Sequence, residues 1–275
     1  MRPKRILRKL KGKGAGGGAG KKRGGFQEFS TSAIHDAILR AVEKAAPSGL
    51  TGDYLDIGSG KGELLTLLAN RYPELRSFAC DCTDELMQRE KQKVVLVDLN
   101  QQPLPFADKR FDLVTCSETI EHLEDYWRVL REIFRVLRPG GLAVFTTPNI
   151  LNLRSRFRFF STGFYNLFGP LMPDEKDVYS PRGHITPVSW FYLANALLSI
   201  GFDDLDMTVD KYQRKSLLPF AFLIVPIRLS NRIALRREAK KYLSVGERNR
   251  STVRAINSTD LLLGRTLIVR ARRPR

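Results

Sequence analysis

The sequence predicts an α/β fold built on a doubly wound, mostly parallel sheet of seven strands. Short apolar runs rich in β-branched residues alternate with amphipathic segments between residues 54 and 148. Strands that read as continuous apolar runs and are separated by helices are typical of a parallel sheet covered on both faces. A glycine-rich turn directly after the first run adds the strand-to-helix junction at which such sheets bind ligands.

The first half of the chain supplies one leading helix and five strands. Residues 32–46 carry apolar side chains at helical spacing, and Pro139-Gly140-Gly141 ends the helical segment that precedes the fifth strand. The five predicted strands are YLDI (54–57), SFACD (77–81), VVLVDL (94–99), FDLVTCSE (111–118) and LAVFTTP (142–148). The amphipathic segments between them, ELLTLLANRY, DELMQREK and YWRVLREIFRVL, are expected to be helices.

The second half completes the sheet. We expect a helix in VSWFYLANALLSIGF, a strand near residues 204–209 and a final strand in RTLIVRAR. The predicted organisation is therefore a flexible basic tail at 1–25, a main domain at 26–210, an apolar and basic insertion at 211–264, and the final strand with a basic end at 265–275. Within the main domain, residues 149–185 are expected to form a cap over an acceptor.

The net charge of +17 is concentrated at the two ends of the chain. Residues 1–25 have ten Lys and Arg and no acid, and residues 228–275 have fourteen against three acids; the middle, 26–227, has 22 basic and 26 acidic residues. Basic flanks attract anionic membrane surfaces or nucleic acid. Three cysteines without a paired pattern, and a start without a long apolar core, favour a cytoplasmic protein.

The insertion contains the apolar stretch SLLPFAFLIVPIRL at 216–229. It is shorter than the roughly 20 residues that cross a bilayer, and two prolines and an arginine weaken a spanning helix. Two interpretations stay open: packing in the protein core, or insertion into the membrane interface beside the following arginines.

The turn YLDIGSGKGELL points to a small polar ligand, because Gly58, Gly60 and Gly62 let a ligand approach the backbone closely. The phosphate-loop pattern GxxxxGK[ST] fails at Leu55 and Gly62, and the dinucleotide pattern GxGxxG fails at Glu63. What remains is DxGxGxG.

With this motif the chain resembles the class I S-adenosylmethionine-dependent methyltransferases over about residues 30–210. The resemblance implies a Rossmann-like methyltransferase fold and S-adenosylmethionine as cofactor. It places Asp56 and the three glycines around the methionine and ribose portion, Asp81 on the ribose hydroxyls, Asp98 and Leu99 at the adenine, and Ser117 beside the methionine. One carboxylate can accept hydrogen bonds from two neighbouring hydroxyls, which suits Asp81.

The stretch SETIEHLED follows the fourth strand and is the candidate catalytic segment. If it opens a helix, Glu118, Glu121 and His122 share one face, and two carboxylates with an imidazole suit a divalent ion such as Mg²⁺. The pattern resembles small-RNA 2′-O-methyltransferases and ubiquinone-pathway O-methyltransferases. In the RNA branch a later histidine completes the metal site, which implies His184 here. A metal-free role for His122 or His184, or simple capping of the helix, stays open.

These observations predict an enzyme that methylates oxygen of a hydroxylated small-molecule, lipid-linked or saccharide acceptor, with His122, His184 and Glu121 as catalytic residues. The basic flanks and the 216–229 segment suggest a position on the cytoplasmic membrane surface. The interleaved arginines and aromatics of 148–170, with GHITP and the late insertion, make the chain also similar to bacterial envelope-associated methyltransferases. The alternatives are an RNA 2′-O-methyltransferase and a non-catalytic membrane-tethering scaffold.

Overall fold

The computed structural model describes residues 32–171 and 183–275. The predicted basic tail at 1–25, and residues 172–182 of the predicted cap, lie outside the described residues.

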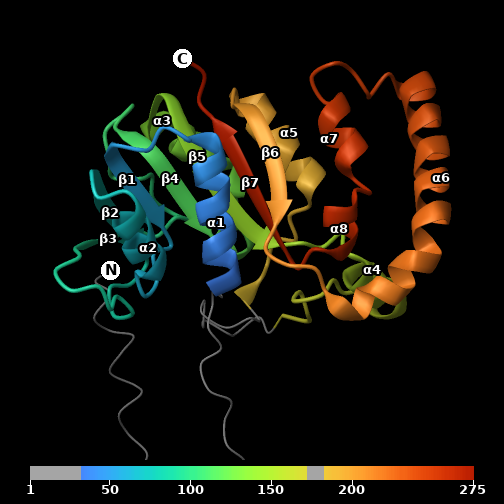
Figure 1. The fold of residues 1–275 in the computed structure, drawn as a ribbon, viewed down its shortest axis with the longest axis horizontal. Helices are drawn as coiled ribbons and strands as arrows, with labels where there is room; N and C mark the ends of the chain where they lie inside the picture. Colours follow the sequence, from blue (N-terminus) through green and yellow to red (C-terminus); the bar gives the residue numbers. More distant parts are fainter. Residues whose placement is uncertain (1–31, 172–182) are drawn as a thin grey trace, which may run out of the picture.

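Seven strands form one sheet in the order β3-β2-β1-β4-β5-β7-β6 (Figure 1). The first five strands run parallel to one another, and β7 is antiparallel to both of its neighbours. The bounds are β1 Gly52–Ile57, β2 Leu75–Asp81, β3 Val94–Leu96, β4 Phe111–Ser117, β5 Leu137–Pro148, β6 Asp203–Val209 and β7 Thr266–Arg272. The predicted seven-stranded, mostly parallel sheet is confirmed.

Helices cover both faces of this sheet (Figure 1). The α-helices are α1 Ser32–Ala45, α2 Glu63–Arg71, α3 Tyr126–Val136, α4 Leu153–Thr162, α5 Trp190–Ile200, α6 Leu217–Tyr242, α7 Arg250–Ala255 and α8 Thr259–Leu263, with short 3₁₀ turns η3 Ile120–His122 and η5 Arg214–Ser216. Side chains alternate across β5, so that Phe145 packs into the core under α3 and α5, whereas Val144 packs into the core under α1 and α2.

Two predicted elements differ in the structure. DELMQREK forms turns rather than a helix, and the third strand ends at Leu96 instead of residue 99. The backbone N–H of Gln88 donates to the Lys61 carbonyl at 3.1 Å, and the sulfur of Met87 lies against Gly62. Contacts with the glycine-rich turn therefore override the local helical pattern.

The apolar stretch at 216–229 belongs to α6 from Leu217 onward, and no residue of α6 is buried; Ser216, in the turn before it, is buried. Packing in the core, one of the two interpretations left open, is therefore wrong. By length and composition, α6 with the turn before it is the one helix in the described part of the chain that could cross a membrane.

Asn149 connects the end of β5 to the last elements of the chain. Its side-chain amide donates to the carbonyls of Leu261 and Gly264, both at 3.0 Å, and its oxygen accepts from the Leu151 N–H at 3.0 Å. The residue is 4% exposed. Each buried group that loses its partner costs about 1–3 kcal/mol.

We expect Asn149→Ala to lower the free energy of unfolding by about 2–4 kcal/mol, because two buried carbonyls and the half-buried N–H of Leu151 each lose a hydrogen bond. Urea denaturation measures the change. Asn70→Ala, at an exposed position of α2, is the control and should stay within about 0.5 kcal/mol of the wild type. Equal effects of the two substitutions would contradict the bridging role.

Candidate active site

Three strands of the sheet end at one level. Ile57 of β1 is paired with Cys80 of β2 on one side and with Cys116 of β4 on the other. The residues that follow, Gly58, Asp81 and Ser117, therefore leave the sheet side by side at the carboxyl edge, where open α/β sheets bind their ligands.

The glycine-rich turn adopts a backbone that only glycine accepts easily. Gly58 has φ +70° and Gly62 has φ +78°, and a Cβ at these positions would lie 2.2 Å from Thr119 Oγ1 and 2.6 Å from Met87 Sδ. Gly60 also has positive φ, but a Cβ there would meet no atom within 4 Å. The turn thus packs tightly at its two ends and is open at its centre, as a ligand cradle requires.

Asp81 holds the turn in place. Its carboxylate accepts the N–H of Gly60 at 2.9 Å and the N–H of the next residue, Cys82, at 2.7 Å. The carbonyl of Cys80 accepts from the N–H of Gly58 at 2.9 Å. The Asp81 oxygen that accepts from Cys82, Oδ1, also receives the N–H of Thr83 at 3.4 Å, whereas among the described residues Oδ2 accepts only from Gly60 and keeps a lone pair for a ligand hydroxyl.

Asp56 lies beneath the turn rather than on its surface. It is 3% exposed, and its carboxylate accepts the hydroxyl of Thr115 at 2.6 Å, which in turn lies 2.8 Å from the hydroxyl of Tyr54. Burial raises the pKa of Asp56 to about 7, although the hydrogen bond from Thr115 acts in the opposite direction. Asp56 is thus a buried residue at the end of β1, and its side chain bonds to Thr115 of β4.

The other predicted cofactor residues lie at the same edge. Asp98 is exposed after β3 and accepts the N–H of Asn100 at 2.9 Å, and Leu99 beside it is half-buried. The hydroxyl of Ser117 lies 3.0 Å from that of Thr146 at the end of β5.

The segment SETIEHLED does not open an α-helix. Glu118 has φ +48°, residues Ile120–His122 form a single 3₁₀ turn, and the next α-helix begins only at Tyr126. The hydroxyl of Thr146 donates to the Glu118 carboxylate at 3.0 Å and accepts its N–H at 2.9 Å. The expected shared helical face is therefore wrong, and the Glu118 carboxylate is held by Thr146 instead.

Glu121, His122 and His184 form a three-residue cluster. One ligand atom from each lies within 4.8 Å of the other two, and the two imidazole rings are 4.7 Å apart. The carbonyl of Glu121 accepts the N–H groups of Ile185 and Thr186 at 2.9 and 3.0 Å, which brings His184 to this place. Three of the four residues expected at a metal are thus together; Glu118 is outside the cluster.

The cluster combines an unpaired buried carboxylate with neutral imidazoles. Both carboxylate oxygens of Glu121 are buried without a hydrogen-bond partner. Burial, and next the nearby Glu118, raise the pKa of Glu121; burial lowers the pKa of His122; burial and then His122 lower the pKa of His184 to about 4. A cation would stabilise this buried carboxylate, and unprotonated imidazoles can donate a lone pair. The three side chains are therefore suitable ligands for a divalent metal ion.

Three threonines that the sequence analysis did not single out shape the site. Thr115 supports Asp56, Thr119 fills the space beside Gly58, and Thr146 holds Ser117 and Glu118. Their roles depend on strand pairing, such as that of Asp56 with Thr115, which a single sequence does not display.

A comparison with known families matches residues 55–145 to the family described as "Methyltransferase domain". The match covers the glycine-rich turn, Asp81 and the Glu121-His122 pair. The chain carries a class I S-adenosylmethionine-dependent methyltransferase domain. This confirms the resemblance, the cofactor and the fold expected from the sequence.

Curated relatives of this methyltransferase domain include two quinone-pathway proteins. The chain is 29% identical over 147 residues to "Ubiquinone/menaquinone biosynthesis C-methyltransferase UbiE" of Desulfotalea psychrophila, covering 50% of this chain and 59% of the relative. It is 30% identical over 138 residues to "Demethylmenaquinone methyltransferase" of Geobacillus stearothermophilus, covering 46% and 59%. The chain thus spans about three fifths of the length of these relatives.

Solved structures share the fold of the methyltransferase domain. A SAM-dependent methyltransferase from Archaeoglobus fulgidus has a TM-score of 0.53 at 18% identity, covering 86% of this chain and 94% of that one. Phosphoethanolamine N-methyltransferase 2 of Haemonchus contortus, in complex with S-adenosyl-L-methionine, has a TM-score of 0.50 at 18% identity, covering 87% and 53%.

The raised pKa of Asp56 predicts a pH dependence of stability. Asp56 retains its proton in the folded state up to about pH 7, whereas its unfolded value is 3.8, so unfolding releases a proton between these pH values. Raising the pH through this window therefore lowers the free energy of unfolding.

We expect Asp56→Asn to make this decline smaller, because the amide oxygen can still accept from Thr115 and does not titrate. Glu118 and Glu121, whose pKa values burial also raises, keep their own contributions to the decline. Urea denaturation from about pH 4 to about pH 7 measures the difference between variant and wild type. Asp98→Asn, at an exposed carboxylate, should leave the pH profile unchanged. A variant profile parallel to that of the wild type contradicts the assignment.

Proposed function

We propose that this protein methylates an oxygen of a hydroxylated small-molecule or lipid-linked acceptor, with S-adenosylmethionine as methyl donor. The observation that carries the proposal is the cluster of Glu121, His122 and His184, which lies at the same edge of the sheet as the glycine-rich turn. An acceptor hydroxyl at the cluster would face the cofactor site. The quinone-pathway names of the curated relatives support a small, lipid-like acceptor.

The cofactor site follows from the geometry of the turn. The open centre at Gly60 would admit the methionine and ribose portion, and Asp81 would accept from the ribose hydroxyls while it holds the turn. Asp98 and Leu99 would face the adenine, and the backbone of Ser117 the methionine. When bound, S-adenosylmethionine supplies a methyl group on a sulfonium that is open to attack by a nucleophile.

His122 is oriented for a specific task. Its Nδ1 lies 3.0 Å from the carbonyl oxygen of Gly183, which can only accept, so Nδ1 carries the proton and Nε2 keeps a free lone pair. That lone pair can bind a metal ion or take the proton of the acceptor hydroxyl. The lowered pKa values of His122 and His184 keep both rings neutral at physiological pH.

Glu121, His122 and His184 would hold a divalent ion such as Mg²⁺ or Mn²⁺, and Glu118 is left out of the ligand set. A bound ion polarises an oxygen and lowers the pKa of a hydroxyl at the site. Glu121 gains most from the ion, because no hydrogen bond of ordinary geometry reaches its buried carboxylate, and the nearby Thr147 only partly offsets the rise of its pKa.

Methylation of carbon is the second candidate, because the relative from Desulfotalea psychrophila is called a C-methyltransferase. Mass spectrometry of small molecules, lipids and RNA, from cells with and without the protein, should reveal the acceptor as a species that gains the mass of one methylene group. Carbon-13 NMR of the product made with labelled cofactor then separates a methyl on oxygen from one on carbon. A modified RNA, or a methyl on carbon, would overturn the proposal.

We expect Asp81→Ala to weaken S-adenosylmethionine binding roughly 100-fold, since two hydrogen bonds to a charged acceptor are lost. Isothermal titration calorimetry measures the affinity. Glu90→Ala, which removes an exposed carboxylate from the same loop region, is the matched control. Unchanged affinity in Asp81→Ala would remove Asp81 from the cofactor site.

We expect Glu121→Gln to weaken Mn²⁺ binding at least about tenfold, because the amide keeps the shape but not the charge of the ligand. Glu124→Gln is the matched control: it removes an exposed carboxylate three residues along the chain and outside the cluster, and it should bind the ion like the wild type. Calorimetry with Mn²⁺ gives the affinities. Equal losses in both variants, or no binding by the wild type, would exclude the three-residue metal site and leave His122 as a base.

A further inference from the structure

The outward face of α6 is a continuous apolar stripe. Leu218, Phe222, Val225, Leu229 and Ile233 recur at intervals of three and four residues, which places them on one side of the helix. They are 70%, 74%, 70%, 59% and 52% exposed. Five large apolar side chains in a row in water mark a surface that binds something apolar.

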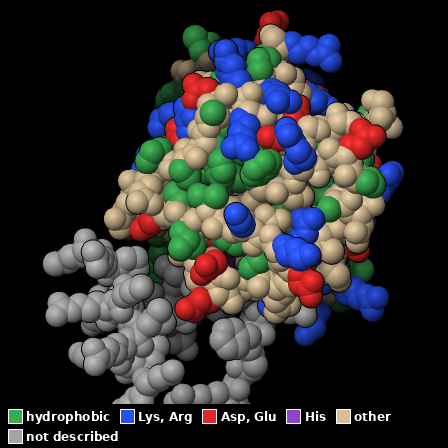
Figure 2. All heavy atoms as spheres, turned by 90° about the vertical axis from the view of Figure 1, so that its left-hand side faces the viewer, with side chains coloured by type: hydrophobic (Ala, Val, Ile, Leu, Met, Phe, Trp, Pro, Cys, Tyr) green, Lys and Arg blue, Asp and Glu red, His purple; other side chains and the backbone are tan. Residues whose placement is uncertain are grey.

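Positive charge accompanies the stripe. The helix has six Lys and Arg and one acid, all in the half that begins at Arg228. The opposite end of the molecule differs, since acidic and basic side chains are intermingled there (Figure 2). An apolar stripe that continues into a basic half is typical of helices lying in the interface of an anionic membrane.

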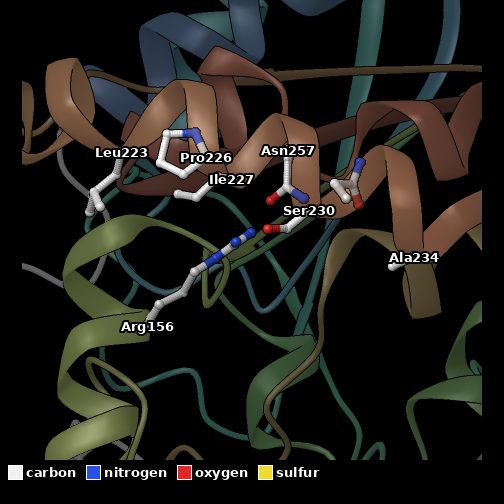
Figure 3. A pocket seen from close by; sticks show the side chains of 8 residues that line it. Arg156, Leu223, Pro226, Ile227, Ser230, Ala234 and Asn257 are labelled. Atoms are coloured by element: carbon white, nitrogen blue, oxygen red, sulfur yellow. The ribbon is translucent and has the colours of Figure 1, made fainter.

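A cavity of about 400 Å³ lies between α4, α6 and the loop that joins α7 to α8, and Arg156 points into it (Figure 3). No carboxylate among the described residues pairs with this guanidinium, which donates to the Leu151 carbonyl at 2.6 Å. Asn257, across the cavity, has a buried side-chain oxygen without a partner. Leu223, Pro226 and Ile227 form the apolar part of the wall. A guanidinium that pairs with no carboxylate of the described residues, beside an apolar wall, suits the phosphate and upper chain of a phospholipid.

The start of α6 lies at the edge of the sheet that carries the cluster of Glu121, His122 and His184. β6 runs parallel to β5, so its carboxyl end lies at the same edge of the sheet as the cluster, and α6 begins shortly after β6 (Figure 1). The most apolar part of the stripe is therefore the part nearest to that edge. α4, with Phe160 90% exposed, also starts there, just after β5.

We propose that α6 lies in the headgroup region of an anionic membrane, with its apolar stripe inserted and a lipid phosphate bound by Arg156. The helix lies along the membrane rather than across it, because its inner face lines the cavity with Ser230 and Asn231 opposite Arg156. A spanning orientation would place these polar groups in hydrocarbon without partners. The proposal does not depend on the methyl acceptor.

The test is flotation of the full-length protein with phosphatidylcholine vesicles, with and without phosphatidylglycerol. We expect the wild type to float only with the anionic vesicles and less at high salt. Phe222→Ser should weaken binding about tenfold, and Leu96→Ser, an exposed leucine at the other end of the sheet, should not. Arg232→Gln with Arg236→Gln should weaken binding about fivefold per removed charge, and Lys93→Gln should not.

The phosphate site is tested with Arg156→Gln, which should weaken flotation severalfold. Inorganic phosphate, offered alone, should not raise the melting temperature of the wild type; an Arg156-dependent rise would indicate a site for a free anion and overturn this part. Calorimetry with S-adenosylmethionine shows that each variant is folded and keeps its cofactor affinity.

Four outcomes would overturn the proposal. They are flotation without anionic lipid, flotation unaffected by Phe222→Ser, resistance of the bound protein to extraction with alkaline carbonate, and a dimer in light scattering that Phe222→Ser dissolves. Resistance to alkaline carbonate would indicate a helix that spans the membrane. A dimer that Phe222→Ser dissolves would indicate that a second copy of the chain covers the stripe. A loss of RNA binding without a loss of vesicle binding in the arginine variants would instead assign the basic half to nucleic acid.

Discussion

Strand β1 is hydrogen-bonded on both sides, to β2 and to β4, and this double parallel pairing determines the level at which all three strands end. Because Ile57 is opposite both Cys80 and Cys116, the glycine-rich turn, Asp81 and the segment after Ser117 begin at the same height. A shift of one residue in either pairing would turn the buried side chains of that strand to the opposite face of the sheet. The cofactor cradle and the catalytic cluster are thus consequences of one register.

The cluster itself depends on main-chain contacts far apart in the sequence. Residues 185 and 186 donate to the carbonyl of Glu121, and Thr186 also donates its hydroxyl to the Leu123 carbonyl at 2.6 Å. These bonds hold His184 against His122, with Phe168 packed against His184 at 5.3 Å between ring centroids. The same packing excludes water from Glu121, and this exclusion makes its carboxylate a strong ligand for a cation.

Features that depend on local sequence patterns, such as the strands and the glycine-rich turn, could be predicted from the sequence. Features that depend on contacts between distant residues could not. The apolar runs gave the sheet, and the alternating glycines gave the turn, because both signals are local. The segment 84–91 has a helical pattern, but Met87 is needed beside Gly62. Glu118 looked like part of a helical face, yet Thr146, from another strand, holds both its N–H and its carboxylate. The pairing of His122 with His184 was reached only through resemblance to known methyltransferases.

The place of β7 has a consequence for how the chain folds during synthesis. β7 follows β6 in the chain but lies between β5 and β6 in the sheet. Until the ribosome has released β7, β5 presents an unpaired edge and β6 has no neighbour to pair with. An open edge of this kind is prone to pairing with other nascent chains. The nascent protein is therefore most exposed to aggregation, and most in need of a chaperone, while the segment containing α6 is being translated.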